Sequence, residues 1–325
     1  MAPKALSMRD GGALPKKRRR FTRDDLELTG LSFFTVLWYM AFCYLPIFGI
    51  VFAFKRYKLA PGKGFLYSLF VNSKWVGLDN FKFLFLNPNM INIFRNTLTY
   101  NIIFLLIGIT LPVTLAIAIT HIYSKRLAKV CQTAMFLPHF LSWVVVSYFV
   151  YAFLSTDRGL FNSIITSQGG TAIRWYQEEK YWPFILIIMN TWKTIGYSMV
   201  VYMATISGID QTLYESAVID GATVWQQIKG ITLPLLRPII SIMFILNIGH
   251  ILSTDFGLFY HVTRNSNSIV AVTQTIDVYV YKALMVDSNF GFSSATSLLQ
   301  NGIGCILIIG TNLIVKKISP GSGLF

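Results

Sequence analysis

Six apolar runs, each long enough to cross a membrane, constrain this chain of 325 residues more than any other feature. A helix needs about 20 apolar residues to cross the hydrocarbon core of a bilayer. The runs lie near 31–54, 96–120, 130–154, 181–207, 236–262 and 295–315. Only 13% of the residues are charged, against about 25% in soluble domains. Because lipid cannot satisfy backbone polar groups, the runs predict an all-α integral membrane protein with six transmembrane helices.

The N-terminal tail sets the predicted orientation. It carries the cluster KKRRR shortly before the first run, and positive charge beside the first helix favours a cytoplasmic location. Six crossings return the chain to the same side, so both termini are predicted to be cytoplasmic, with anionic membrane lipid as the partner of the cluster. The net charge of +14 does not indicate nucleic acid, because no basic soluble domain accompanies it. The predicted organisation is a basic tail over 1–30, a transmembrane domain over 31–317 and a short tail over 318–325.

The first predicted outer loop, residues 55–95, contains the sequence KWVGLDNFKFLFLNP. Aromatic residues alternate there with polar ones, which is typical of a small folded cap or an interfacial helix. A docking surface for an external partner and an aromatic belt at the membrane surface are both consistent with this pattern.

Several catalytic and cofactor motifs are absent from the sequence. There is no G-x-x-x-x-G-K-[ST] phosphate cradle, no H-E-x-x-H and no G-x-S-x-G. The four histidines fall in different segments, and the three cysteines show no metal-ligand spacing. The sequence therefore predicts neither an enzyme nor a metal site, and no cofactor is expected in this chain. If the protein uses ATP, another subunit must bind it.

The polar stretch between the fourth and fifth runs reads ESAVIDGATVWQQIKGITLP over residues 215–234. Gly221 permits a sharp break between two helical segments. Asp220 is expected to cap the segment that follows, and Pro234 is expected to end the local structure before the next span. Glu215 offers a carboxylate to a basic partner. The stretch is therefore expected to be more than a simple connector.

The spacing of this stretch resembles the EAA loop of ABC-importer permeases. Glu215-Ser216-Ala217 is followed after three residues by Gly221, then after nine residues by Ile231, and then by Leu233-Pro234. Ser216 departs from the usual alanine but is also small. The stretches WVGLDNFKFLF, NTWKTIGYSMV and LYESAVIDGA resemble the carbohydrate, maltose-permease-like branch of that family. PHFLSWVVVS resembles its subgroup for oligosaccharides and polysaccharide fragments, including uronate-containing ones. The resemblance covers about residues 30–317.

This resemblance implies the type I ABC-importer permease fold and a bacterial cytoplasmic membrane location. It implies that residues 213–234 form a coupling helix that sits in a cleft of a cytoplasmic ATPase. The expected coupling residues are Glu215, Ser216, Ala217, Asp220, Gly221, Leu233 and Pro234. The implied partners are a second related permease, two ATPase subunits that bind ATP and Mg, and an extracytoplasmic solute-binding protein.

Polar residues inside the spans predict a substrate pathway. Apart from Arg237 at the start of the fifth run, Lys193 and Asp255 are the only Lys, Arg, Asp or Glu within the predicted spans, and such residues usually face a partner or a watery cavity. Two sets recur at helical spacing, so each set shares one face of a helix. They are Asn190, Lys193 or Thr194, and Tyr197 in one span, and Asn247, His250 and Thr254 in the next, with Ser253 adjacent. By resemblance, Trp192 and Tyr197 match positions that line the sugar site of maltose-type permeases, and His250 and Ser253 fall near a second set.

The predicted pathway therefore consists of Asn190, Trp192, Lys193, Tyr197, Asn247, His250, Ser253 and Asp255. In the alternative interpretation, Trp192 and Tyr197 pack between helices and Lys193 forms a structural ion pair with Asp255. The cation at position 193 also favours an oligosaccharide that carries negative charge.

Two other functions fit parts of the pattern. An ABC permease for another small solute, such as an amino acid or a polyamine, would also carry the EAA loop. A secondary transporter or channel that works without ATP would suit six helices and buried charges, but it leaves the loop unexplained.

Overall fold

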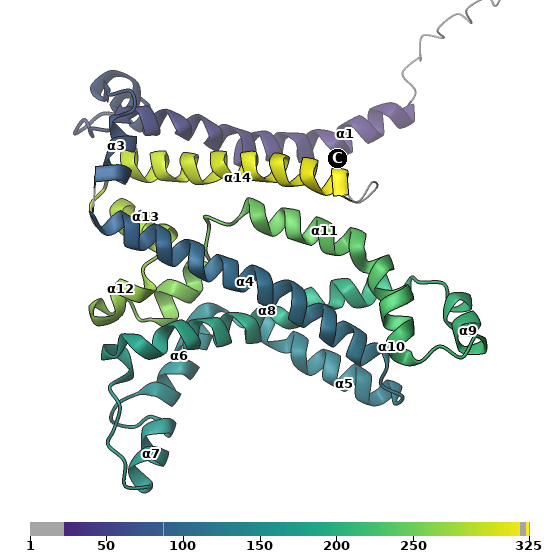
Figure 1. Cartoon of the computed structure of the whole chain (residues 1–325). Coiled ribbons are helices and arrows are strands. Elements are labelled where there is room, and N and C mark those ends of the chain that lie inside the picture. The colour runs from purple at the N-terminus through teal and green to yellow at the C-terminus, as the bar shows by residue number, and fades with distance from the viewer. Residues whose placement is uncertain (1–22, 87, 319–322, 325) are drawn as a thin grey trace, which may run out of the picture. The chain divides into compact units, whose positions relative to one another are not determined.

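The computed structural model describes residues 23–86, 88–318 and 323–324 of the chain (Figure 1). The KKRRR cluster and most of the two predicted tails lie outside the described residues. The chain divides into two compact units, residues 1–49 and 50–325. In the first unit, α1 (Arg23–Tyr39) continues into the π-helical η1 (Met40–Tyr44). The 3₁₀ helix η2 (Leu45–Phe54) then completes a helical run over Glu27–Phe54 that is long and apolar enough to cross a membrane, as the first run predicts.

The second unit begins with a small folded cap, which agrees with the prediction for residues 55–95. Its strands β1 (Lys55–Arg56) and β2 (Lys74–Trp75) pair antiparallel. The elements α2 (Phe65–Tyr67), η3 (Ser68–Asn72) and α3 (Asp79–Leu86) complete it. The buried ammonium of Lys55 donates a hydrogen bond to the carbonyl of Leu69 at 2.9 Å, and the amide of Asn80 donates to the carbonyl of Ala53 at 2.9 Å. These bonds reach carbonyls in η3 and η2 and so tie the elements of the cap together.

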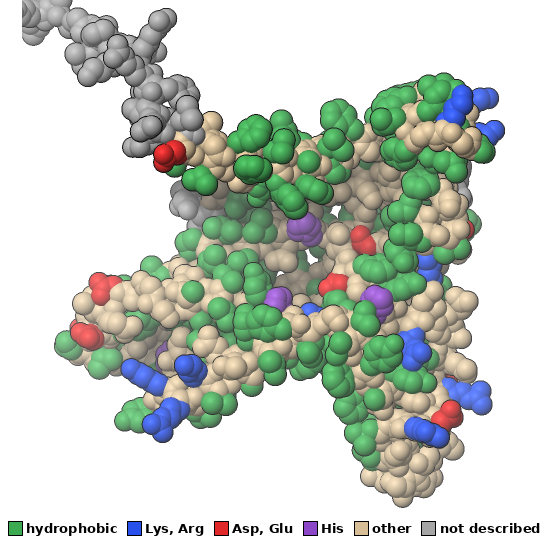
Figure 2. Space-filling model, turned by 180° about the vertical axis from the view of Figure 1, so that it is seen from behind, with side chains coloured by type: hydrophobic (Ala, Val, Ile, Leu, Met, Phe, Trp, Pro, Cys, Tyr) green, Lys and Arg blue, Asp and Glu red, His purple; other side chains and the backbone are tan. Residues whose placement is uncertain are grey.

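Long apolar helices form the framework of the second unit. Its main helices are α4 (Pro88–Thr120), α5 (Lys125–Phe136), α6 (Trp143–Leu154), α8 (Trp182–Ser207), α11 (Leu233–Gly249) and α14 (Phe290–Ile318). Helices α4 and α8 pack side by side (Figure 1) and bury Val113 and Ala116 against Met199 and Tyr202. Together with the helical run over Glu27–Phe54 and one bent pair, the described residues contain up to six candidate spans. Figure 2 shows hydrophobic side chains exposed over wide areas, as expected for helices that face lipid.

The third predicted span, 130–154, is not one straight helix. Helix α5 continues into η4 (Leu137–Phe140), and α6 then leaves at an angle of 101°. Pro138 is the second residue of the 3₁₀ turn, and Ser142 caps α6 because its hydroxyl accepts a hydrogen bond from the backbone N–H of Val145. A proline followed by a capping serine therefore replaces the continuous helix that the apolar run predicts.

The fifth predicted span, 236–262, is also interrupted. Helix α11 ends at Gly249, residues 250–255 are not α-helical, and η8 (Leu258–Val262) follows. The amide of Asn101 donates to the carbonyl of Ile251 at 2.8 Å, and that of Gln300 donates to the carbonyl of Leu252 at 2.7 Å. Irregular backbone at membrane depth requires such partners, and here distant helices supply them.

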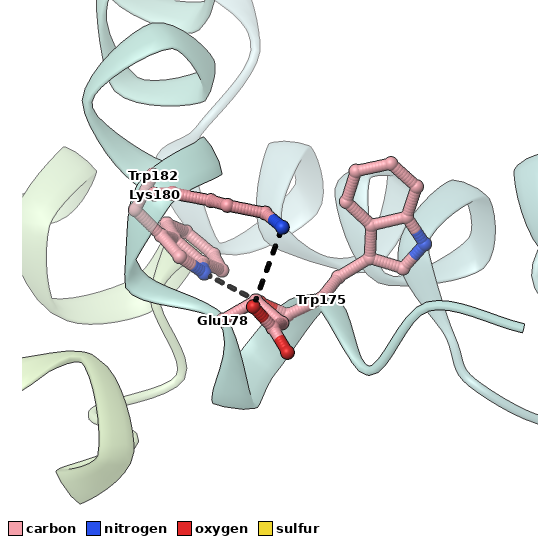
Figure 3. A network of polar contacts seen from close by, with 4 residues as sticks. All are labelled: Trp175, Glu178, Lys180 and Trp182. Atoms are coloured by element: carbon pink, nitrogen blue, oxygen red, sulfur yellow. Dashed lines mark hydrogen bonds and ion pairs between the residues drawn. The ribbon is translucent and has the colours of Figure 1, made fainter.

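The segment between α6 and α8 is folded. It contains α7 (Leu160–Ser167), η5 (Trp175–Gln177) and η6 (Glu179–Tyr181). Figure 3 shows the indole of Trp182 donating a hydrogen bond to the carbonyl of Trp175 at 2.8 Å, and Lys180 paired with Glu178 at 3.8 Å. The side chain of Asn162 donates to the carbonyl of Ile173 at 2.8 Å and accepts from the indole of Trp175. This predicted outer loop is thus tied to the start of α8.

The last part of the chain closes the unit. The elements η9 (Asn267–Ile269), α12 (Val270–Thr273) and α13 (Ile276–Met285) lead into α14. A methyl group placed on Gly304 of α14 would collide with the backbone carbonyl of Gly249 in α11. Two glycines therefore permit the two helices to approach at backbone distance, which is common between helices in membranes.

Candidate functional site

The predicted coupling loop folds as a helical hairpin over residues 210–232, here called the α9–α10 hairpin. Helix α9 (Gln211–Ile219) is followed by α10 (Val224–Gln227) and the π-helical η7 (Ile228–Thr232). Asp210 caps α9 because its carboxylate accepts a hydrogen bond from the backbone N–H of Thr212 at 3.0 Å. The same bond lowers the pKa of the exposed Asp210 carboxyl below its usual value. Sequence reasoning missed this cap, although an Asp directly before a helix is a known start signal.

The turn of the hairpin depends on Gly221, as predicted. Its φ of +76° lies in the left-handed region. The N–H of Gly221 donates to the carbonyl of Val218, and that of Ala222 donates to the carbonyl of Ala217 at 2.9 Å. This pair of bonds is the Schellman arrangement, which ends a helix and reverses the chain.

Two predicted local roles in the loop are wrong. Asp220 does not cap the second segment, because it ends α9 and Thr223 is the N-cap of α10. The backbone N–H of Thr223 donates to the side-chain oxygen of Gln226 at 2.7 Å, which completes a capping box. Pro234 does not end the local structure either. It lies within a helix that runs from Val224 to Gly249, just after the π-helical turn η7.

The hairpin presents a mixed surface and is attached firmly to α11. The hydroxyl of Tyr214 is 2.9 Å from that of the buried Thr232, so α9 is hydrogen-bonded to the base of α11. Glu215 and Ser216 are exposed, while Ala217 and Leu233 are half-buried. Ile219 is 85% exposed. A carboxylate beside exposed apolar side chains is suited to contact another protein. Figure 1 shows α9 at the end of the unit that also holds the start of α5.

A polar cavity of about 340 Å³ lies between α4, α8 and the end of α11. It brings together six of the eight residues predicted for the pathway, namely Asn190, Tyr197, Asn247, His250, Ser253 and Asp255. The polar wall residues Asn101, His139 and Ser198 were not among those predicted for the pathway. An asparagine within an apolar run is a signal that could have identified Asn101.

Trp192 lies outside the polar cavity. It lines an apolar pocket with Val146, Phe149 and Ile188. Trp192 is two positions after Asn190 along the helix, which turns its side chain about 200° away. Lys193 lies at the flank of the cavity, where its ammonium donates to the backbone carbonyl of His139 at 3.0 Å.

Trp143 connects Lys193 and Asp255. Its indole N–H donates to the carboxylate of Asp255 at 2.5 Å, and the ammonium of Lys193 lies 5.2 Å from the centre of its ring. Asp255 also accepts from the backbone N–H of Gly257 at 2.8 Å. Within the described part of the chain, ion pairs occur at Lys82–Asp79 and Lys180–Glu178 but not between Lys193 and Asp255. The alternative of a direct structural ion pair is therefore wrong.

His139 forms part of an aromatic stack beside the cavity. Its ring lies 4.6 Å from that of Tyr197 at an angle of 14°, and Phe136 continues the stack. The Nδ1 atom of His139 is buried and lacks a hydrogen-bond partner in the described structure. A buried polar atom without a partner costs free energy, so a ligand or a water molecule at this position would stabilise the site.

The cavity has the chemistry of a site for a polyhydroxylated solute. Its amides, hydroxyls and imidazoles donate and accept hydrogen bonds, and the ring of Tyr197 offers a flat apolar surface. Among the described residues, no three His, Cys, Asp or Glu side chains are grouped to hold a metal ion. The arrangement suits binding and passage of a solute.

Residues 108–260 match the protein family described as binding-protein-dependent transport system inner membrane component. Protein LplB of Bacillus subtilis is 33% identical over 290 residues, which cover 89% of this chain and 88% of that protein. The polygalacturonan/rhamnogalacturonan transport system permease protein YteP of the same organism is 34% identical over 281 residues, covering 86% of this chain and 85% of YteP.

Solved structures show the same fold. The chain is similar to a chain of a bacterial ABC transporter involved in the import of the acidic polysaccharide alginate, with a TM-score of 0.80 and 30% identity. The match covers 91% of this chain and 97% of the other. A further structure, of a bacterial alginate ABC transporter in complex with an alginate pentasaccharide-bound periplasmic protein, matches with a TM-score of 0.79. The fold of this chain is therefore that of an ABC-importer permease.

Proposed function

The chain belongs to the family of binding-protein-dependent transport system inner membrane components, and from this premise we propose that it imports acidic, uronate-containing oligosaccharides as one permease subunit of an ATP-driven complex. The observation that carries the proposal is the polar cavity, whose walls combine amides, hydroxyls and an aromatic stack in the middle of three apolar helices. A cavity of this kind suits a sugar better than an apolar solute.

The acidic character of the cargo rests on two further observations. Lys193 brings a cation to the flank of the cavity without a carboxylate in ion-pair distance among the described residues. The relatives named for polygalacturonan and alginate transport handle acidic polysaccharides. The carboxylate of Asp255 lines the same cavity, but three donors engage it, since the N–H of Leu258 also points at it at 3.4 Å.

The proposed complex contains a second related permease, two ATPase subunits and an extracytoplasmic solute-binding protein. ATP and Mg would bind to the ATPases, and the α9–α10 hairpin would dock into a cleft of one of them. The exposed Glu215 and Ile219 support this role for the hairpin. The complex would reside in the bacterial cytoplasmic membrane with both termini of this chain in the cytoplasm.

The test is ATP-driven uptake by the whole complex in proteoliposomes. Trigalacturonate is one substrate, and its carboxyl-reduced, neutral analogue is the other. We expect trigalacturonate to accumulate only when ATP, the ATPases and the binding protein are all present. Uptake by this chain without ATP would instead identify an ATP-independent transporter. Import of an amino acid or a polyamine in place of either sugar would identify an ABC permease for another solute.

A further inference from the structure

A second polar pocket, of about 380 Å³, lies beyond the polar cavity along η8. Its side chains come from α6, from η8 and from the turn that follows η8. Beside the apolar Val144, they are Ser147, Tyr148, Tyr260, His261, Arg264 and Asn265. None of these residues lines the polar cavity. We call this place the Arg264 pocket.

The backbone holds Arg264 in an uncommon conformation. Arg264 has a φ of 53° and Asn265 a φ of 51°, so two consecutive residues other than glycine lie in the left-handed region. This conformation is uncommon for side chains larger than glycine. The N–H of Arg264 donates to the carbonyl of His261 at 3.0 Å, and the hydroxyl of Thr263 accepts from the N–H of Asn265. The turn therefore fixes the point from which the arginine leaves the chain.

The guanidinium is held on an aromatic face. It lies 4.0 Å from the centre of the Tyr151 ring, which is a cation–π geometry. The ring of Tyr176 is 5.9 Å from that of Tyr151, and burial raises the pKa of Tyr176 to about 12. The phenol of Tyr176 is therefore neutral at physiological pH.

The charge of Arg264 lacks an acidic partner. In the ranges 23–86, 88–318 and 323–324, no carboxylate lies within ion-pair distance of its guanidinium. A guanidinium carries five N–H donors in a planar fork that matches a carboxylate. The tyrosine rings, the hydroxyl of Ser147 and the amide of Asn265 surround it with groups that suit a sugar ring.

We propose that the Arg264 pocket is a second sugar-binding site, in which the guanidinium binds the carboxylate of a uronic acid residue of the cargo. The inference rests on the proposed function and adds a site to it. In the predicted orientation, residue 264 follows the fifth span on the outer side, so the site would receive the cargo before it reaches the polar cavity. A lipid phosphate would use the cation alone, whereas a uronate would also use the aromatic and hydroxyl groups.

The test measures binding by the purified complex without its binding protein. Isothermal titration calorimetry gives the affinities for trigalacturonate and for its carboxyl-reduced analogue in nanodiscs of neutral lipid. Arg264→Gln is expected to weaken trigalacturonate binding by a factor on the order of ten, because a charge-assisted bidentate bond is lost. Arg264→Lys keeps the charge but not the planar fork. Its affinity for trigalacturonate should therefore lie between those of the unchanged protein and Arg264→Gln. The matched control is Arg158→Gln, an exposed cation that does not line the pocket, and it should bind within about twofold of the unchanged protein.

Four results would overturn the site. The first is the absence of the expected effect: either Arg264→Gln binds trigalacturonate with unchanged affinity, or the unchanged complex does not bind it. Another is equal loss for the neutral analogue, which would show a structural role. A third is loss of the Arg264→Gln effect when phosphatidylglycerol is added, which would assign the pocket to lipid. The fourth is weaker capture of the sugar-free binding protein by Arg264→Gln, which would assign it to that protein. If uptake by the unchanged complex meets the expectation given above, these results remove the pocket and leave the proposed function standing.

Discussion

The indole N–H of Trp143 donates a hydrogen bond to the carboxylate of Asp255 at 2.5 Å. Trp143 begins α6 immediately after the bend of the third span, and Asp255 ends the irregular segment of the fifth. A methyl group on Gly257 would collide with the same indole. The two interruptions of the membrane helices are therefore packed and hydrogen-bonded to each other.

Trp143→Phe is expected to lower the free energy of unfolding by about 1 kcal/mol, because the carboxylate of Asp255 loses one donor while most of the ring packing remains. Thermal unfolding of the complex in detergent, followed by circular dichroism, measures the change. Trp192→Phe is the matched control, since Trp192 lines an apolar pocket. Equal melting temperatures for Trp143→Phe and the unchanged protein would contradict this role of the bond.

Gly221→Val is expected to uncouple ATP hydrolysis from transport. A β-branched residue at a φ of +76° costs about 1–2 kcal/mol and distorts the turn of the α9–α10 hairpin. Assembly and basal ATPase activity should persist, while stimulation by loaded binding protein and sugar uptake fall. Gly221→Asn is the control, because asparagine tolerates the left-handed region. Normal uptake by the valine variant would refute the need for this turn.

Asp210→Ala should loosen α9, whereas Asp210→Asn should not, because asparagine is an equally good N-cap. Hydrogen exchange of the α9 amides in the complex measures the difference. The lowered pKa of Asp210 also fixes a pH dependence. The stabilisation of α9 by the Asp210 carboxylate is fully present above the pKa of Asp210 in the unfolded chain, near 3.8. It is lost as the pH falls through the lower pKa of Asp210 in the folded protein. If the α9 amides exchange equally fast in the two variants, and faster than in the unchanged protein, the N-cap role of Asp210 is contradicted.

Gly304→Ala is expected to destabilise the complex by about 1–3 kcal/mol, because the new methyl group meets the carbonyl of Gly249 and must push α11 from α14. Gly302→Ala, on the same helix, meets nothing within 4 Å and should be neutral or slightly stabilising. Thermal unfolding of both variants provides the comparison. A result in which the two are equally stable would show that the close approach is not required.

Lys193→Met is expected to reduce uptake of trigalacturonate on the order of tenfold, with a smaller effect on the carboxyl-reduced analogue. The reason is the loss of the one cation at the flank of the polar cavity. Lys193→Arg keeps the charge and serves as the control. If both sugars lose uptake equally and the complex melts at a lower temperature, the lysine acts through its bond to His139 and its contact with Trp143.

Local sequence signals identified much of the fold. The apolar runs located all the candidate spans, because a bilayer demands long apolar helices. The spacing around Gly221 located the hairpin turn, because only a residue that tolerates positive φ fits there. Helical spacing also placed Asn190 and Tyr197 on one wall of the polar cavity.

The interruptions of the spans could not be read from periodicity. The backbone at 250–255 departs from the helix because Asn101 and Gln300, which are far away in the sequence, bind its carbonyls. The bend near 141 had a weak local signal, a proline and a serine four residues apart, which the apolar run masked. The contact of Lys193 with Trp143 instead of Asp255 depends on this bend, so the sequence alone did not reveal it.

The helix from Val224 to Gly249 connects the α9–α10 hairpin to the polar cavity. Its 26 residues make a rod of about 39 Å at a rise of 1.5 Å per residue. Thr232, in the first half of this helix, is hydrogen-bonded to Tyr214, and Asn247, near its other end, lines the cavity. The rod acts as a lever arm. If it rotates about its hairpin end, a tilt of about 10° displaces its cavity end by roughly 7 Å. A displacement of that size exceeds the diameter of a single sugar ring, so a small rotation at the hairpin would be geometrically sufficient to change the width of the cavity.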